Sequence, residues 1–295
     1  MLHSNKDFSS HVSGPVPEFS ITDLVDFLWA NPDLQNTSSD FYRACSSLLE
    51  RRFQDTFDNC SLAPIKIFGL DFSFPNISMG NISSRHLFGI DELLIFKFYS
   101  ENRKRYKKVC DIGCNLGLHS ILLCELGYEV TSFEPDPAHF AVCSSLLAAY
   151  PKSNLINAAV SNYAGKANFT RILDNTTGSF INKKKHAYGP IEEFTVDVVN
   201  ASSLSEGFDL FKIDAEGSEI DVLTGLDAGC FERSDFVLEL STEESRRDFW
   251  ELRSALDLTA YSQKNSWRPV SEISELPNSH REGSVFLSKR KAGFV

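Results

Sequence analysis

The 295-residue sequence has no long apolar run: none approaches the about 20 residues that a membrane-spanning helix needs. The segment from Met1 to Pro17 is polar and lacks the apolar centre of a signal peptide. The seven cysteines are an odd number at irregular spacings, which favours free thiols in a reducing compartment. We therefore expect a cytoplasmic protein with no membrane partner.

Basic residues are scarce as well, with 29 Lys and Arg against 40 Asp and Glu and a net charge of −11. Non-specific affinity for nucleic acids comes mainly from Lys and Arg contacts with phosphates. The acidic balance therefore argues against a nucleic-acid partner and favours a neutral or small acceptor.

Short apolar runs alternate with helical stretches through the second half of the chain. The runs occupy 109–112, 128–133, 153–156, 209–213 and 236–240. Such alternation is typical of an α/β fold with a parallel sheet and crossover helices. A helix at 246–256 and a strand at 284–288 would complete a seven-stranded, mostly parallel, Rossmann-like sheet. The connection 157–208 is too long for a simple loop, and its strand-like pieces at 166–172 and 194–199 predict a hairpin or lid.

Residues 1–62 are expected to form a polar tail and a small helical segment, and residues 63–295 the Rossmann-like domain. Ser20 resembles a helix N-cap, and a second amphipathic helix is predicted to start at Asp40. These helices are candidates for a cap over the active site, for a contact in a homo-oligomer, or for a simple cover of the core. A hairpin at 65–74 and a helix at 87–99 are predicted to follow.

The segment that starts at Val109 reads as a buried strand, a turn and a helix. Gly113 and Gly117 allow the backbone to approach a ligand closely. A dinucleotide fingerprint would also need glycines where Asn115 and Leu118 stand, so a pyrophosphate has little room. Asp111, at the strand end, is placed to accept an ammonium group, which suits S-adenosylmethionine better than a dinucleotide.

A second acid follows 23 residues after Asp111. Glu134 ends the next predicted strand, where an acidic side chain can accept both hydroxyls of a ribose. Either acid alone is weak evidence for a ligand site, because acids at strand ends are often turn or helix-cap residues. Together, at this spacing, Asp111 and Glu134 predict a site for an adenosine-containing cofactor.

Five short motifs follow one another through this region: D-I-G-C-N-L-G-L-H-S at 111–120, F-E-P-D-P at 133–137, N-A-A-V-S at 157–161, K-I-D-A-E-G-S-E at 212–219 and V-L-E-L at 237–240. Over roughly residues 65–290 the sequence resembles FkbM-type S-adenosylmethionine-dependent methyltransferases. Because known members mostly methylate hydroxyls of sugars, polyketides and similar metabolites, the resemblance implies a class I methyltransferase fold and O-methylation of a carbohydrate or small metabolite. It also implies further cofactor contacts, at Asn115, Pro135, Asn157 and Ala158.

Three acids should meet at the carboxyl edge of the sheet, namely Asp214, Glu216 and Glu239. Asp214 can contact the cofactor, and Asp214 or Glu216 can act as the general base that removes a hydroxyl proton, with His119 or His186 as weaker candidates. Alternatively the three acids hold Mg²⁺, which prefers oxygen ligands. Glu216 has a purely structural alternative, since acids favour helix starts.

Two further features remain open between structure and function. His119 lies in the first turn after the glycine loop, where it either packs and caps the helix or contacts the cofactor carboxylate. The polar run 174–179, followed by three lysines at 183–185, suits recognition of a hydroxylated or acidic acceptor, or is a plain surface loop.

Three other functions stay in competition with O-methylation. The first is methylation of a macromolecule, which the acidic charge and the absence of an Asn/Asp-Pro-Pro-Tyr/Phe motif oppose. The second is a non-catalytic Rossmann-like scaffold subunit, which the intact Asp111, Glu134 and Asp214 oppose. The third is a nicotinamide dehydrogenase, which the missing third glycine opposes.

Overall fold

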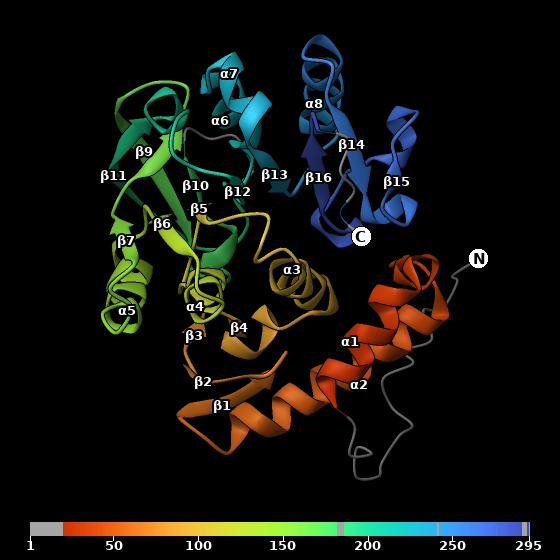
Figure 1. The fold of residues 1–295 in the computed structure, drawn as a ribbon. Helices are drawn as coiled ribbons and strands as arrows, with labels where there is room; N and C mark the ends of the chain where they lie inside the picture. The colour runs from red at the N-terminus through yellow and green to blue at the C-terminus, as the bar shows by residue number, and fades with distance from the viewer. Residues whose placement is uncertain (1–19, 182–185, 241, 291–293, 295) are drawn as a thin grey trace, which may run out of the picture.

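The computed structural model describes residues 20–181, 186–240, 242–290 and 294. Its main sheet has eight strands in the order β15-β14-β16-β13-β12-β5-β6-β7 (Figure 1). The strands are β5 Lys108–Ile112, β6 Glu129–Phe133, β7 Ser153–Ile156, β12 Leu210–Ile213, β13 Asp235–Leu238, β14 Thr259–Ser262, β15 Arg268–Pro269 and β16 Val285–Ser288.

The half of this sheet from β7 to β13 is parallel, and β16 runs antiparallel to β13 and β14. This is the predicted mostly parallel, Rossmann-like α/β architecture. The expected number of seven strands is exceeded by one, because the two residues of β15 pair with the end of β14 at the sheet edge.

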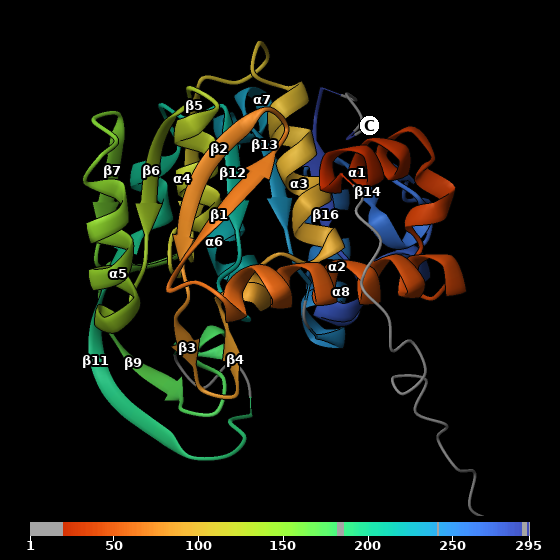
Figure 2. The same cartoon turned by 90° about the horizontal axis from the view of Figure 1, so that it is seen from below.

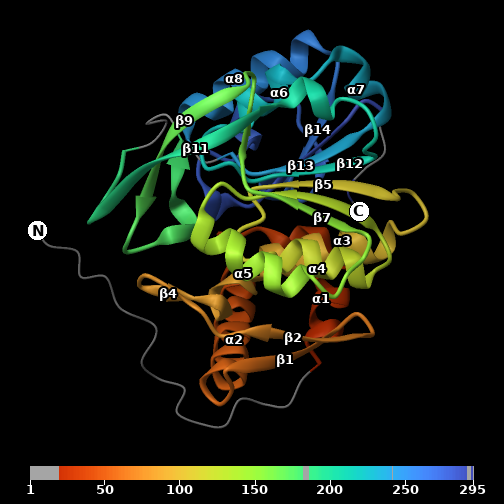
Figure 3. The same ribbon diagram turned by 90° about the vertical axis from the view of Figure 1, so that its left-hand side faces the viewer.

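Helices cover both faces of the sheet (Figure 3). One face carries α3 Ile90–Glu101, α4 Leu118–Glu125 and α5 Pro137–Leu147, and the other carries α6 Glu219–Gly225, α7 Ala228–Arg233 and α8 Glu243–Ala255. Successive residues of β5 point to opposite faces, so Val109 and Cys110 belong to two different hydrophobic clusters. Burial on both faces explains why the central strands read as continuous apolar runs.

The long connection between β7 and β12 builds a second sheet, in the order β10-β9-β11-β8. Its strands are β8 Ala159–Ser161, β9 Gly165–Ile172, β10 Phe180–Ile181 and β11 Ile191–Asn200. The predicted hairpin is confirmed, since β9 and β11 pair antiparallel along eight residues. Figure 2 shows β9 and β11 extending past the end of α5 toward β3 and β4.

The N-terminal segment contains α1 Ile21–Ala30, α2 Asp40–Asp58, the hairpin of β1 Leu62–Ile67 and β2 Leu70–Pro75, and the short pair β3 Ser78–Met79 and β4 Ile82–Ser83. The predicted helix N-cap at Ser20 is confirmed, because its side-chain oxygen accepts a hydrogen bond from the Asp23 backbone N–H. The expected helix at 87–99 starts later, at Ile90, because residues 84–87 form a separate 3₁₀ turn. Side chains of α1 and α2 share one hydrophobic cluster with α3 and α4.

Short 3₁₀ helices occupy several connections: η2 Pro32–Gln35, η3 Ser84–Leu87, η4 Thr176–Gly178, η5 Ala201–Leu204, η6 Gln263–Asn265, η7 Ile273–Glu275 and η8 His280–Glu282. The seven cysteines are all free thiols, as expected. Over the part of the chain that the structure describes, no helix combines the length and apolar character needed to cross a membrane.

Candidate active site

A cavity of about 390 Å³ lies at the carboxyl edge of the parallel strands. Its volume is within the about 300–1,000 Å³ of typical small-molecule sites. Residues that follow four neighbouring strands line it, namely Gly113, Glu134, Asp214 and Glu239. This is the position that the sheet topology favours for a ligand.

In the glycine loop after β5, two glycines lie in close contact with neighbouring segments of the chain. Gly113 has φ +77°, and a Cβ atom there would lie 1.9 Å from the carbonyl oxygen of Asp214. Gly117, at φ +86°, precedes α4, and a Cβ atom there would lie 2.6 Å from Cys143 Sγ. Both positions therefore require glycine, because any side chain would displace either the neighbouring β12 loop or α5.

Glu134 is 5% exposed and lies in the cavity wall. Its Oε2 accepts a hydrogen bond from the Asn115 amide and its Oε1 one from the Asp136 amide, both at 2.8 Å. Burial raises the pKa of Glu134 to about 8, although the two amides oppose this shift. The carboxylate is thus held by backbone alone, with lone pairs left on both oxygens.

The other residues expected beside the cofactor divide into two groups. Asn115, Pro135 and Ala158 line the cavity, and Asn115 Oδ1 is buried without a hydrogen-bond partner among the described residues. Asn157 does not line it. Its Nδ2 donates instead to the carbonyl oxygens of Glu134 and Pro135 at 2.8 and 3.2 Å, so it braces the loop that carries Glu134.

Asp111 also lies outside the cavity wall, because its neighbours enclose it completely. Ser120 Oγ donates to its Oδ2 at 2.6 Å, and Lys212, its register partner on β12, places Nζ 3.8 Å from Oδ1. Asp111 therefore lies behind the cavity wall, and its contact with a ligand ammonium stays a prediction. The residue ties β5 to α4 and β12.

Asp214, Glu216 and Glu239 all line the cavity, as predicted. Lys212 Nζ donates to Asp214 Oδ2 at 3.2 Å. Burial alone would lower the pKa of Lys212, but Asp214 and then Asp111 outweigh burial and raise it. Burial first, and then the charge of Asp214, raise the pKa of Glu239 well above its ordinary value.

The alternative that these acids bind Mg²⁺ is not supported. Across the described ranges, no three His, Cys, Asp or Glu side chains are grouped as ligands of one ion. The physical reason is Lys212, whose ammonium group lies beside Asp214 and supplies the positive charge there.

His119 is held by a hydrogen-bond chain. Its Nε2 lies 2.6 Å from Glu92 Oε2, and its Nδ1 lies 3.1 Å from the Tyr99 hydroxyl. The ring packs edge-on against Phe96. His119 and Glu92 line a smaller cavity of about 50 Å³ beside the glycine loop. His119 therefore both packs in the core and borders the site.

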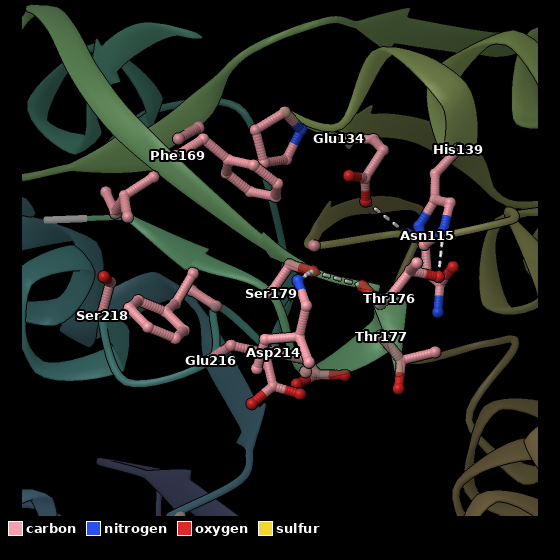
Figure 4. Close-up of a pocket in the computed structure, with 18 of the residues that line it drawn as sticks. Asn115, Glu134, His139, Phe169, Thr176, Thr177, Ser179, Asp214, Glu216 and Ser218 are labelled. Atoms are coloured by element: carbon pink, nitrogen blue, oxygen red, sulfur yellow. Dashed lines mark hydrogen bonds between the residues drawn. The ribbon is translucent and has the colours of Figure 1, made fainter. Parts of the chain in front are cut away.

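Residues 175–179 of the polar run form the wall that faces Glu134, with η4 at its centre (Figure 4). His139 Nε2 lies 2.8 Å from Thr176 Oγ1, which joins this wall to α5. His186 and Tyr188 also line the cavity. The three lysines at 183–185 lie outside the described residues.

Sequence reasoning gave no role to Lys212, Glu92, His139 or Ser218, which all border one of the two cavities. Lys212 offered a signal, since it is the only charged residue in an otherwise apolar buried strand, where a charge needs a partner. The sequence gives no such signal for Glu92, because acidic residues in the first turn of a helix are already explained by the helix dipole.

The strand order and the position of the cavity define a class I, Rossmann-like methyltransferase fold. Residues 111–266, more than half of the chain, match the model of the methyltransferase FkbM domain, and the chain belongs to this family. Family and fold together support S-adenosylmethionine as the methyl donor. No curated protein matches the chain.

Solved structures of methyltransferases resemble the chain at low identity. An S-adenosylmethionine-dependent methyltransferase from Agrobacterium tumefaciens shares 11% identity at a TM-score of 0.45, over 77% of this chain and 70% of that one. An rRNA methylase from Streptococcus thermophilus shares 12% at 0.36, over 66% and 92%. A tRNA (uracil-54, C5)-methyltransferase from Pyrococcus abyssi, in complex with S-adenosyl-L-homocysteine, shares 13% at 0.39, over 77% and 43%. These values are too low to transfer an acceptor.

Proposed function

We propose that the protein transfers the methyl group of S-adenosylmethionine to a hydroxyl group of a carbohydrate or another small metabolite. The main support is the arrangement of acids in one cavity. Figure 4 shows Glu134 with Asn115 on one side and Asp214 with Glu216 on the other. A nucleoside and a hydroxylated acceptor can therefore lie next to each other between them.

The cavity wall fits the nucleoside part of this cofactor. Each oxygen of Glu134 takes one backbone N–H and keeps a lone pair for a ribose hydroxyl. The buried Asn115 Oδ1 can accept a further hydrogen bond from a ligand, since it has no partner among the described residues. When bound, the cofactor would supply a methyl group on a sulfonium: the acceptor oxygen would bond to the methyl carbon as the carbon–sulfur bond breaks, with S-adenosylhomocysteine as the leaving group.

We assign Asp214 as the general base. An alcohol is a poor nucleophile until its proton is removed, and the displacement needs the nucleophile aligned with the methyl group. Lys212 fixes one oxygen of Asp214 and leaves the other for the acceptor proton. Because its pKa is raised, Glu239 stays protonated over a wider pH range and can donate a hydrogen bond to the acceptor. Glu216 borders the same space.

The acceptor wall favours a small polyhydroxylated molecule. Side chains that both donate and accept hydrogen bonds line it, namely Asn175, Thr176, Thr177, Ser179 and Tyr188. The carboxylates across the cavity and the net charge of −11 disfavour a polyanionic acceptor such as RNA.

The test has two stages. Calorimetric titration should show micromolar binding of S-adenosylmethionine and no binding of NAD. Labelled methyl transfer is then measured to monosaccharides, glycans, polyol metabolites and tRNA, and the product is treated with base to separate stable ethers from esters. A base-stable methyl ether on a sugar or metabolite is expected. Labelling of tRNA alone, or preference for NAD, would contradict the proposal.

A further inference from the structure

The small cavity adjoins the main one and contains groups of both charges. The two cavities share part of their lining, namely Leu87, Glu92, Gly113, Asn115 and Asp214. Lys212 also borders the small cavity, as do Leu116 and Leu118 at the start of α4. A zwitterion suits such a space, because each of its charged ends meets a group of opposite sign or the positive end of a helix.

The carboxylate of Glu92 is fixed in position by His119 and Tyr99. Tyr99 is completely buried, and burial raises the pKa of its hydroxyl well above the ordinary value, so the hydroxyl keeps its proton. When this hydroxyl donates to His119 Nδ1, the ring N–H that faces Glu92 Oε2 is on Nε2. One donor occupies one oxygen of Glu92, whose side chain remains 26% exposed.

Asp111, the acid that the sequence predicts beside the ammonium group, lines neither cavity. Asp111 is 0% exposed and is enclosed by Ser120 and Lys212. Glu92 comes from α3, outside the residues 111–266 that match the family model. A cationic ligand group at the glycine loop therefore meets Glu92 rather than Asp111. Asp214 lines the same small cavity, but the Lys212 ammonium group already pairs with its charge.

We propose that Glu92 binds the ammonium group of the amino-acid end of S-adenosylmethionine, an inference that rests on the proposed function. The amino-acid end would then follow the glycine loop, and the first turn of α4, where backbone N–H groups favour an anion, would hold its carboxylate. His119 is a positioning residue that orients Glu92.

The test compares S-adenosylhomocysteine with its deaminated analogue, in which hydrogen replaces the ammonium group. Calorimetry on the whole chain should give at least about tenfold weaker binding of S-adenosylhomocysteine to Glu92→Gln, since hydrogen bonds to charged groups contribute at this level. The dissociation constant for the deaminated analogue should be unchanged. Glu101→Gln is the matched control, because this acid lies on the same helix, paired with Lys97 and outside both cavities.

The outcomes separate the two proposals. If neither ligand binds the unsubstituted protein, the proposed function itself fails. If both ligands bind and Glu92→Gln weakens them equally, or only Asp214→Asn shows the selective loss, the assignment of Glu92 is wrong. Should Glu92→Gln lower the melting temperature strongly, Glu92→Asp keeps the charge but shortens its reach, and it should show the same selectivity to a smaller degree.

Discussion

The two sides of the cavity are held by different kinds of contact. On the cofactor side, backbone amides fix Glu134, and the Asn157 side chain bonds the carbonyl groups of its loop. On the acceptor side, contacts join segments distant in sequence: Gly80 forms a bridge with Asn175, and His139 bonds Thr176. The contacts on the cofactor side join residues at most 23 positions apart, whereas those on the acceptor side join residues at least 37 positions apart. The acceptor side therefore depends on how the β3–β4 turn and α5 pack against residues 175–179.

The largest effect is expected where the two sides meet, at Asp214. Asp214→Asn keeps the side-chain volume but cannot take a proton, so kcat should fall by about 10²–10⁴. The dissociation constant for S-adenosylhomocysteine should change little. Methyl-transfer kinetics and calorimetry measure the two quantities, and Asp197→Asn, at an exposed ion pair of β11, is the control. Wild-type turnover in Asp214→Asn would remove the general base from the mechanism.

A smaller but still large effect is expected from Glu134→Ala. At pH 9, where the Glu134 carboxylate is ionised, the dissociation constant for S-adenosylhomocysteine should rise about 100-fold, because the ribose loses a charged acceptor and two amides lose their partner. Glu129→Ala, at the exposed start of the same strand, should bind normally. Unchanged binding in Glu134→Ala would mean that the backbone-held side is not where the nucleoside lies.

The raised pKa of Glu134 should make the affinity for S-adenosylhomocysteine depend on pH, by about tenfold. Only the ionised carboxylate accepts both ribose hydroxyls, and burial raises its pKa to about 8, so affinity for S-adenosylhomocysteine should increase from pH 7 to 9. Calorimetry across this range should find a flat profile in Glu134→Gln. Without ligand, stability should fall as the pH rises from 4.5 to about 8, because the folded state keeps a proton that the unfolded state releases. Affinity that falls with pH would contradict this assignment.

The same contrast explains how far the sequence could predict the site. The sequence predicts that Gly113, Glu134 and Asp214 lie at one edge of the sheet, because each follows a parallel strand, and all three line the cavity. The enclosure of Asp111 was not predictable, since it depends on the register of β5 with β12, which aligns Asp111 with Lys212. Glu92 was missed because its partner His119 is 27 residues away. Sequence spacing thus predicts which residues lie at the ends of the strands. It does not predict which side chains become partners when distant elements pack together.

The smallest effect is expected from Tyr188→Phe, which should change binding of the acceptor without changing binding of the cofactor. The Tyr188 hydroxyl accepts a hydrogen bond from Asn175 Nδ2 at 3.1 Å and lines the acceptor wall. Tyr188→Phe should raise KM for the acceptor about two- to tenfold, the equivalent of one neutral hydrogen bond, and leave the dissociation constant for S-adenosylhomocysteine unchanged. Tyr150→Phe, whose hydroxyl bonds Glu125 at the surface, is the control for loss of a phenol. If Tyr188→Phe instead weakens S-adenosylhomocysteine binding, the loop that carries Asn175 contributes to both ligands, and acceptor specificity cannot change independently of cofactor affinity.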